Sequence, residues 1–163
     1  GLTQSFKERH TLMLNTIVSD FSLPCTGDRV FTLSACKAKT LVLFFYPKDN
    51  TPGCTTEAGN FRDLHDQFTK AGAEIYGISR DSIKSHENFK AKLGFQFDLL
   101  SDSDEKVCTQ FGVMKMKNMY GKQVRGIERS TFVLDASRKL IHEWRGVKVP
   151  GHVQEVLEIV KAI

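Results

Sequence analysis

The hydrophobic pattern of the chain is most regular between residues 41 and 46. Leu41 to Tyr46 are six apolar residues in succession, and Pro47 ends the run. A continuous run of this length, closed by a proline, is typical of a strand that is buried on both faces of a sheet. The segment 47–53, PKDNTPG, is rich in turn-forming residues, so we expect a loop after the strand.

The pattern after this loop predicts a helix. Thr51 suits the N-cap position and Pro52 suits the first helical position. Residues of one face then recur at helical spacing up to Gly72, where we expect the helix to end: Cys54, Ala58, Phe61, Leu64 or His65, Phe68 and Ala71. Cys54 therefore falls in the first turn of this helix, on the face that packs against the core.

The rest of the chain alternates strands with helices. The pattern predicts strands at 74–79 and 97–101, helices at 83–93, 105–111 and 153–163, and hairpins between Cys25 and Cys36 and over 131–144. This order favours a largely parallel core sheet to which hairpins add antiparallel strands. We therefore expect an α/β protein with a thioredoxin-like fold, a central mixed β-sheet flanked by helices, and an N-terminal β-hairpin. A flavodoxin-like sheet is the alternative, although PKDNTPGC is a poor phosphate-binding turn.

Length and composition fit one globular domain. The chain has 163 residues, of which 40% are hydrophobic and 26% are charged. We expect residues 13–163 to form a single thioredoxin-like domain, and the polar segment 1–12 to be an extension, either native or left from expression. No apolar run is long enough for a membrane helix and no secretory signal is visible, so we expect a cytoplasmic protein that does not contact membranes.

Charge and motifs exclude several other classes of function. The net charge of +4 comes from 23 basic and 19 acidic residues that are interspersed, so nucleic-acid binding is not expected. The five histidines are scattered and none pairs with a cysteine at metal-ligand spacing, so we expect no metal site. No phosphate loop or dinucleotide motif is present, and we expect no cofactor.

Four cysteines are spread along the chain, and none forms a CxxC pair. Cys54 differs from the others because free amides and the dipole at a helix N-terminus favour the thiolate form. The Thr51 hydroxyl, three residues earlier, could donate a hydrogen bond to the sulfur or to a bound oxygen. The alternative is that Cys54 is an inert small residue of the core, as many buried cysteines are. The preceding strand and turn favour the reactive interpretation.

The sequence around Cys54 resembles the active-site motif of a known family. Pro47 to Thr55, PKDNTPGCT, is similar to the PxxxTxxC motif of the peroxiredoxins, and the form YPKDNTPGCT resembles their PrxQ subfamily, also called bacterioferritin comigratory protein. Downstream blocks such as 79–82 (SRDS) and 127–132 (IERSTF) are also similar to that subfamily. The resemblance covers nearly the whole chain, from Asp20 to the end.

The resemblance implies a role for five residues. Cys54 matches the peroxidatic cysteine, and Thr51 matches the residue whose hydroxyl orients the peroxide. Pro47 matches the residue that shields the thiolate from water. Arg129 matches the arginine that stabilises the thiolate and the polarised peroxide, and Glu57 is expected to position this arginine.

A different pairing is open for Arg129 on the residues alone. It could form a surface ion pair with Glu128 or Asp135, as charged neighbours often do. The catalytic assignment has its own physical logic, because peroxide cleavage develops negative charge on the leaving oxygen. Fixed donors aimed at such an oxygen are typically the largest catalytic contribution.

The family likeness implies an antioxidant enzyme, a thiol peroxidase that reduces hydrogen peroxide and organic hydroperoxides through a Cys54 sulfenic acid. Many PrxQ proteins carry a resolving cysteine five residues later or on the following helix, but Gly59 and Lys90 stand at these positions. We therefore expect no resolving cysteine. An external thiol, which could be thioredoxin, glutaredoxin or glutathione, would reduce a monomeric one-cysteine enzyme.

Two other functions stay open at this point. The enzyme could be a two-cysteine peroxidase that uses Cys25, Cys36 or Cys108 as resolver, although Cys108 has the features of a small buried residue. It could also be a non-enzymatic thioredoxin-fold binding module. A disulfide reductase is disfavoured, because Thr51 occupies the first position of the C-x-x-C pair that it needs. Since Cys54 faces the core, we further expect the first helical turn to unwind after oxidation.

Overall fold

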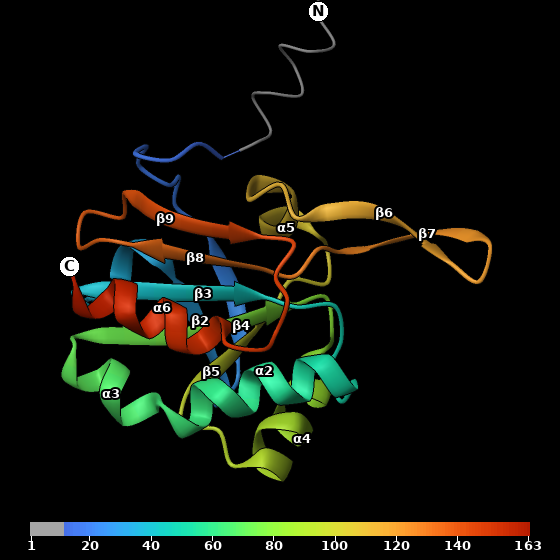
Figure 1. Ribbon diagram of the computed structural model, residues 1–163, viewed down its shortest axis with the longest axis horizontal. Coiled ribbons are helices and arrows are strands. Elements are labelled where there is room, and N and C mark those ends of the chain that lie inside the picture. The colour runs from blue at the N-terminus through green and yellow to red at the C-terminus, as the bar shows by residue number, and fades with distance from the viewer. Residues whose placement is uncertain (1–11) are drawn as a thin grey trace, which may run out of the picture.

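The computed structural model describes residues 12–163 (Figure 1). Residues 1–11 of the expected N-terminal extension lie outside the described residues. At the centre is a seven-stranded sheet with the order β2-β1-β5-β4-β3-β8-β9. Its strands are β1 (Ser22–Cys25), β2 (Arg29–Thr32), β3 (Thr40–Phe45), β4 (Ala73–Ser79), β5 (Asp98–Ser101), β8 (Ser130–Leu134) and β9 (Leu140–Arg145).

The sheet is mixed, as the sequence predicts. β3, β4 and β5 run parallel to one another, and β1, β2, β8 and β9 join through antiparallel pairs. The predicted N-terminal hairpin forms one edge as β1 and β2, and the predicted second hairpin forms the other edge as β8 and β9. Cys25 is the last residue of β1, whereas Cys36 follows β2.

The apolar run after residue 40 forms β3, which is buried along its whole length. Leu41, Leu43 and Phe45 belong to the hydrophobic cluster on one face of the sheet. The alternating Val42 and Phe44 belong to the cluster on the other face. Side chains of a strand alternate between faces, so one strand supplies both cores and fixes the position of the loop that follows it.

Helices cover the two faces unequally (Figure 1). The helices are α2 (Pro52–Asp63), α3 (His65–Lys70), α4 (Ile83–Leu93), α5 (Lys106–Gln110) and α6 (His152–Lys161), with a short 3₁₀ turn, η1 (Leu33–Ala35). Side chains of α2, α3, α4 and α6 pack in the Val42 and Phe44 cluster. Side chains of α5 and η1 pack in the opposite cluster. No helix among residues 12–163 is long and apolar enough to span a membrane.

The single helix predicted from Pro52 to Gly72 is wrong, because it divides into α2 and α3 at Leu64. The backbone of Leu64 has φ −99° and ψ 5°, away from ideal helical values. One competing interaction lies at the break: the Gln96 side-chain amide donates to the Arg62 carbonyl at 3.2 Å. In a continuous helix that carbonyl would accept from the amide four residues later.

A hairpin that the pattern does not predict forms from β6 (Met114–Met119) and β7 (Lys122–Ile127). Lysines and methionines alternate along β6 and most of the side chains are exposed, so the sequence carries no clear apolar face. Tyr120 and Gly121 form the turn, with φ values of 53° and 79°. Two-residue hairpin turns of this kind need positive φ, and Tyr120 is an uncommon residue at such a position.

The packing of the sheet predicts opposite effects for two glycine substitutions. A Cβ at Gly77 in β4 would lie 2.7 Å from a ring carbon of Phe44 and 2.8 Å from a methyl of Leu99, whereas a Cβ at Gly59 in α2 meets nothing closer than 3.6 Å. Gly77→Ala should lower the unfolding free energy by about 1–3 kcal/mol. Gly59→Ala should raise it by up to about 1 kcal/mol, because alanine favours the helix. Denaturant unfolding measures both, and equal effects would contradict this description of the core.

Candidate active site

Cys54 lies in the first turn of α2, on the buried face of the helix. Thr51 is the N-cap residue with extended backbone, φ −89° and ψ 154°, and Pro52 is the first helical residue. Only 1% of Cys54 is exposed, and its side chain belongs to the hydrophobic cluster beneath α2. The start of the helix and the inward direction of the thiol are therefore both as predicted from the sequence.

Arg129, in the link between β7 and β8, reaches this thiol. Its Nη2 lies 3.5 Å from Cys54 Sγ, and its Nη1 donates to Glu57 Oε1 at 2.8 Å. Glu57 is one helical turn after Cys54 and is fully buried. The structure thus brings Cys54, Arg129 and Glu57 together, and the alternative pairing of Arg129 with Glu128 or Asp135 is not formed.

Gly53 is a site residue that sequence reasoning did not single out. A Cβ at this position would lie 3.0 Å from Arg129 Nη2. A larger side chain would therefore crowd the guanidinium against the first turn of α2. The signal for this role is the glycine directly before Cys54, which the sequence pattern marks only as a turn former.

Burial raises the pKa of Glu57 to about 7, although the charge and the hydrogen bond of Arg129 act in the opposite direction. The second carboxylate oxygen, Oε2, has no hydrogen-bond partner among the described residues. His152 Nε2 lies 3.9 Å from it and is hydrogen-bonded to Thr131 Oγ1 at 2.8 Å. Burial lowers the pKa of His152 to about 4, so this ring is neutral near pH 7. Arg129 is consequently the one close cation for Glu57 in the described structure.

The Thr51 hydroxyl donates to the Lys48 carbonyl at 2.8 Å, and not to the sulfur of Cys54, which is one of the two acceptors expected from the sequence. The hydroxyl oxygen still has lone pairs that can accept a hydrogen bond from a peroxide. The role of Thr51 in orienting the peroxide stays a prediction. Pro47 is half-buried at the start of the same loop. Its predicted role as a shield against water also stays a prediction.

Asp49 anchors this loop, a role that the sequence did not reveal. It is 4% exposed and accepts hydrogen bonds from the Tyr46 hydroxyl at 2.6 Å and the Ser85 hydroxyl at 2.8 Å. His86 Nδ1 lies 2.7 Å from the same carboxylate, and the Asp49 amide donates to Asp81 at 3.0 Å. In the sequence Asp49 looked like one more turn former. In the structure it ties the loop before Cys54 to α4.

The same three side chains, Asp49, Asp81 and His86, present potential metal-ligand atoms within 4.8 Å of one another. Hydrogen bonds already engage them, because the second ring nitrogen of His86 faces the Leu100 carbonyl at 2.9 Å and Asp81 accepts from Ser79 at 2.5 Å. The cluster is therefore explained as a link between the loop and α4.

The other cysteines lie in a different part of the core. Cys25 and Cys108 belong to the cluster on the opposite face of the sheet from Cys54, and Cys36 packs against that cluster. Cys25 is buried, while Cys36 is half-exposed. Burial raises the pKa of the Cys25 and Cys108 thiols, which disfavours their thiolates.

Comparison with known proteins identifies the family. Residues 14–143 match the AhpC/TSA family. The chain belongs to this family. Peroxiredoxin Bcp of Xanthomonas campestris is 54% identical to this peroxiredoxin over 151 residues, which are 93% of this chain and 94% of the relative. Peroxiredoxin Bcp of Bacillus subtilis is 46% identical over 151 residues, 93% of this chain and 96% of the relative. The resemblance to the Bcp or PrxQ group of thiol peroxidases is thereby confirmed.

Solved structures confirm the thioredoxin-like peroxiredoxin fold. A structure of X. campestris peroxiredoxin Q covers 87% of this peroxiredoxin and 90% of its own chain, with a TM-score of 0.83 and 55% identity. A PrxQ variant from Xylella fastidiosa covers 94% of this chain and 97% of its own chain, with a TM-score of 0.87 and 47% identity. Another X. campestris structure concerns alkyl peroxide reduction. Two more carry cysteine-to-serine substitutions at positions that differ by 36 residues.

The raised pKa of Glu57 in this peroxiredoxin predicts a pH-dependent stability. The folded state holds a proton up to about pH 7 that the unfolded chain releases near the ordinary carboxyl value of 4.5. The unfolding free energy of the wild type, relative to Glu57→Gln, should therefore fall by roughly 3 kcal/mol as the pH rises through this range. Denaturant unfolding of both proteins at several pH values measures the difference. Parallel pH profiles would show that Glu57 does not titrate as described.

Proposed function

We propose that this chain is a one-cysteine thiol peroxidase that reduces hydrogen peroxide and organic hydroperoxides. The observation that supports it most is the Arg129 guanidinium, which lies between the sulfur of Cys54 and the buried carboxylate of Glu57. A positive charge fixed beside a thiol favours its thiolate, which is the nucleophilic form. Alkyl peroxide reduction by the related X. campestris protein supports the same substrate class.

In the proposed reaction the Cys54 thiolate attacks the terminal oxygen of the peroxide. A sulfur–oxygen bond forms and the oxygen–oxygen bond breaks, so that sulfur loses two electrons and the peroxide gains them. The leaving oxygen takes a proton and departs as water or an alcohol. Cys54 is left as a sulfenic acid, the first and reversible product of thiol oxidation.

Arg129 is proposed to act on both the sulfur and the oxygen that leaves. Charge that develops on a leaving oxygen is stabilised best by donors that are already in place. Glu57 holds Nη1 of Arg129 and so leaves Nη2 directed at the reacting sulfur. Thr51 is proposed to orient the peroxide, and Pro47 to exclude water from the thiolate.

The one-cysteine cycle is supported by the position of the remaining thiols. The central sheet lies between Cys54 and the cluster that contains Cys25 and Cys108. A disulfide needs the two Cα atoms within about 7 Å, so a bridge across the sheet would require a large rearrangement.

Neither of the two resolving positions known in the subfamily carries a thiol. Gly59 is buried in α2, and Lys90 in α4 pairs with Asp98 at 2.6 Å. Lys90 is also 36 residues after Cys54, the same separation as the two cysteines that were replaced in the X. campestris structures. The missing second thiol therefore points to a reductant from outside the chain.

An external thiol would attack the sulfenic sulfur, form a mixed disulfide and release water. A second thiol would then displace Cys54 and restore it. Thioredoxin, glutaredoxin and glutathione are the candidate classes of reductant. The enzyme is proposed to be cytoplasmic and monomeric. Because Cys54 is 1% exposed, the first turn of α2 has to open before a thiol can reach it. Helix ends open at low free-energy cost, since few buried contacts hold them.

The oxidised protein should carry a sulfenic acid on Cys54 and no intramolecular disulfide. We expect one equivalent of hydrogen peroxide to add one oxygen to Cys54, detected by trapping the sulfenic acid and mapping the peptides by mass. Cys54→Ser should consume no peroxide, whereas Cys36→Ser should consume it like the wild type. Amide hydrogen exchange of the same oxidised sample should be faster in the first turn of α2.

Two results would overturn different parts of the proposal. A disulfide between Cys54 and Cys25, Cys36 or Cys108 would replace the one-cysteine cycle by a two-cysteine cycle. Unchanged peroxide consumption in Cys54→Ser would remove the assigned nucleophile. Reduction of the oxidised protein by thiols without faster exchange in the first turn would contradict its opening.

A further inference from the structure

The hairpin of β6 and β7, residues 114–127, stands apart from the rest of the molecule. Its two strands pair with each other and form a sheet of their own, separate from the seven-stranded sheet. In Figure 1 it projects from the body at the end where β3 finishes and α2 begins. An isolated two-stranded hairpin is at best marginally stable in water. Packing within the molecule therefore does not explain why the chain forms a hairpin of this length.

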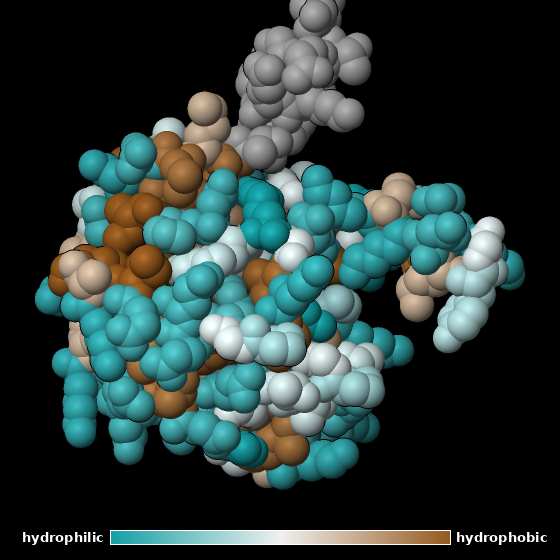
Figure 2. Space-filling view, in the orientation of Figure 1, coloured by the Kyte–Doolittle hydropathy of each residue, from teal (hydrophilic) through white to brown (hydrophobic). Residues whose placement is uncertain are grey.

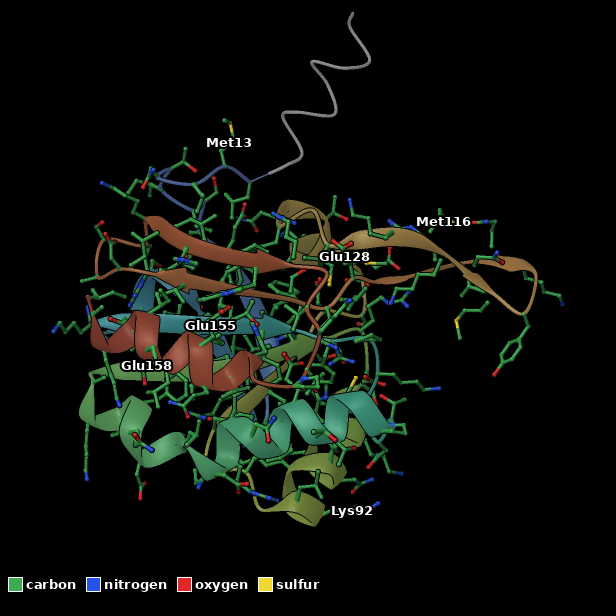
Figure 3. The ribbon with its side chains drawn as sticks, in the orientation of Figure 1. Met13, Lys92, Met116, Glu128, Glu155 and Glu158 are labelled. Atoms are coloured by element: carbon green, nitrogen blue, oxygen red, sulfur yellow. The ribbon has the colours of Figure 1, made fainter. Side chains whose placement is uncertain are left out.

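Exposed apolar side chains gather on this hairpin. Of the nine large hydrophobic side chains that are exposed among residues 12–163, four belong to it: Met116, Met119, Tyr120 and Val124. Tyr120 at the turn is completely exposed, and Figure 3 shows Met116 pointing away from the body. Methionine and tyrosine are enriched at the centres of protein interfaces, and methionine adapts to partner surfaces of different shape.

The hairpin is also uniformly basic. It carries Lys115, Lys117, Lys122 and Arg125, and it contains no acidic residue. In the pairing register Lys115, Lys117 and Lys122 share one face with Met119 and Val124. That face therefore combines apolar side chains with positive charge. In Figure 2 the hairpin overhangs the body as a narrow extension that mixes hydrophilic and hydrophobic side chains.

The hairpin is joined directly to the segment that carries Arg129, which contacts Cys54. β7 ends at Ile127, two residues before Arg129, and Lys117 donates a hydrogen bond to the Ile127 carbonyl. Burial and the charge of Arg129 lower the pKa of Lys117, while a Cys54 thiolate raises it. Because Arg129 Nη2 lies 3.5 Å from Cys54 Sγ, the segment 127–129 links the hairpin to the active site.

We infer that the 114–127 hairpin is the docking surface for a protein thiol reductant whose own surface is acidic and apolar around its reactive cysteine. The inference rests on the proposed peroxidase cycle, in which an external thiol must reach Cys54. A protein reductant has little to bind on Cys54 itself, because that residue is almost completely buried. It needs a neighbouring surface, and complementary charge there accelerates encounter and fixes orientation.

Two pairs of substitutions test the charge and the apolar groups separately. The peroxide-oxidised protein is mixed with reduced thioredoxin, reduced glutaredoxin or dithiothreitol, and the rate constant for reduction of Cys54 is measured at low and high salt. The double variant Lys115→Glu, Lys122→Glu should lower the rate constant for whichever of thioredoxin and glutaredoxin reduces the wild type faster. The decrease should be about ten-fold at low salt and smaller at high salt. Met119→Ser with Val124→Ser should lower the same rate constant by about ten-fold at both salt concentrations.

Matched controls exclude general effects of charge and polarity. Lys70→Glu with Lys92→Glu changes the net charge equally on α3 and α4, and Val30→Ser removes an even more exposed apolar side chain from β2. These controls should leave reduction by the protein unchanged within about two-fold. All variants should keep the wild-type rates with dithiothreitol and with hydrogen peroxide.

Several results would overturn the inference. The first is an equal rate constant for reduction in the hairpin and control variants, and the second is an equal loss of rate when dithiothreitol is the reductant. The third is that neither protein reductant is faster than dithiothreitol. The fourth is a change from dimer to monomer in the hairpin variants, which would show that a second copy of the chain occupies the hairpin. An intramolecular disulfide in the oxidised protein would instead refute only the one-cysteine cycle. In that case the same rate comparison still decides whether the hairpin binds the reductant.

Discussion

The Arg129 guanidinium is shared by two acidic groups, and the rest of the site is arranged around that sharing. One nitrogen lies 3.5 Å from the sulfur of Cys54 and the other donates to Glu57 at 2.8 Å. Glu57 is buried with no other close cation among the described residues, so it depends on Arg129 for its charge. Truncating one partner of such a buried pair leaves the other charge uncompensated, which is costly. The arrangement therefore fixes Arg129 in direction as well as in place.

The fold supplies the parts of this arrangement from distant segments. β3 is packed on both faces and places the loop 47–51, and Asp49 ties that loop to α4 through Ser85 and His86. α2 then begins at Pro52 and turns Cys54 inward, while Gly53 leaves room for the guanidinium. This burial also prevents a reductant from reaching the sulfur of Cys54 directly. We propose that a reductant reaches the sulfur after local opening and docks on the neighbouring basic hairpin of β6 and β7.

Local pattern was sufficient to predict the mixed sheet, its hairpin edges and the start of the helix that carries Cys54. These features depend on continuous apolar runs, turn residues and helical spacing, which are all short-range signals. The place of Arg129 in the site came only from resemblance, because no local rule says that Arg129 and Cys54, 75 residues apart, meet in space. The Asp49 network and the close approach at Gly53 were missed for the same reason. The hairpin of β6 and β7 was not predicted, because its exposed methionines and lysines leave no clear apolar face in the sequence.

The most direct test of the shared guanidinium is a double-mutant cycle on the rate constant for reaction of Cys54 with hydrogen peroxide. Wild type, Glu57→Gln, Arg129→Gln and the double variant are compared by stopped-flow after each is shown to be folded. If Glu57 acts through Arg129, Glu57→Gln lowers the rate constant by about ten-fold in the wild type and has almost no effect in Arg129→Gln. Independent effects that multiply in the double variant would contradict the account.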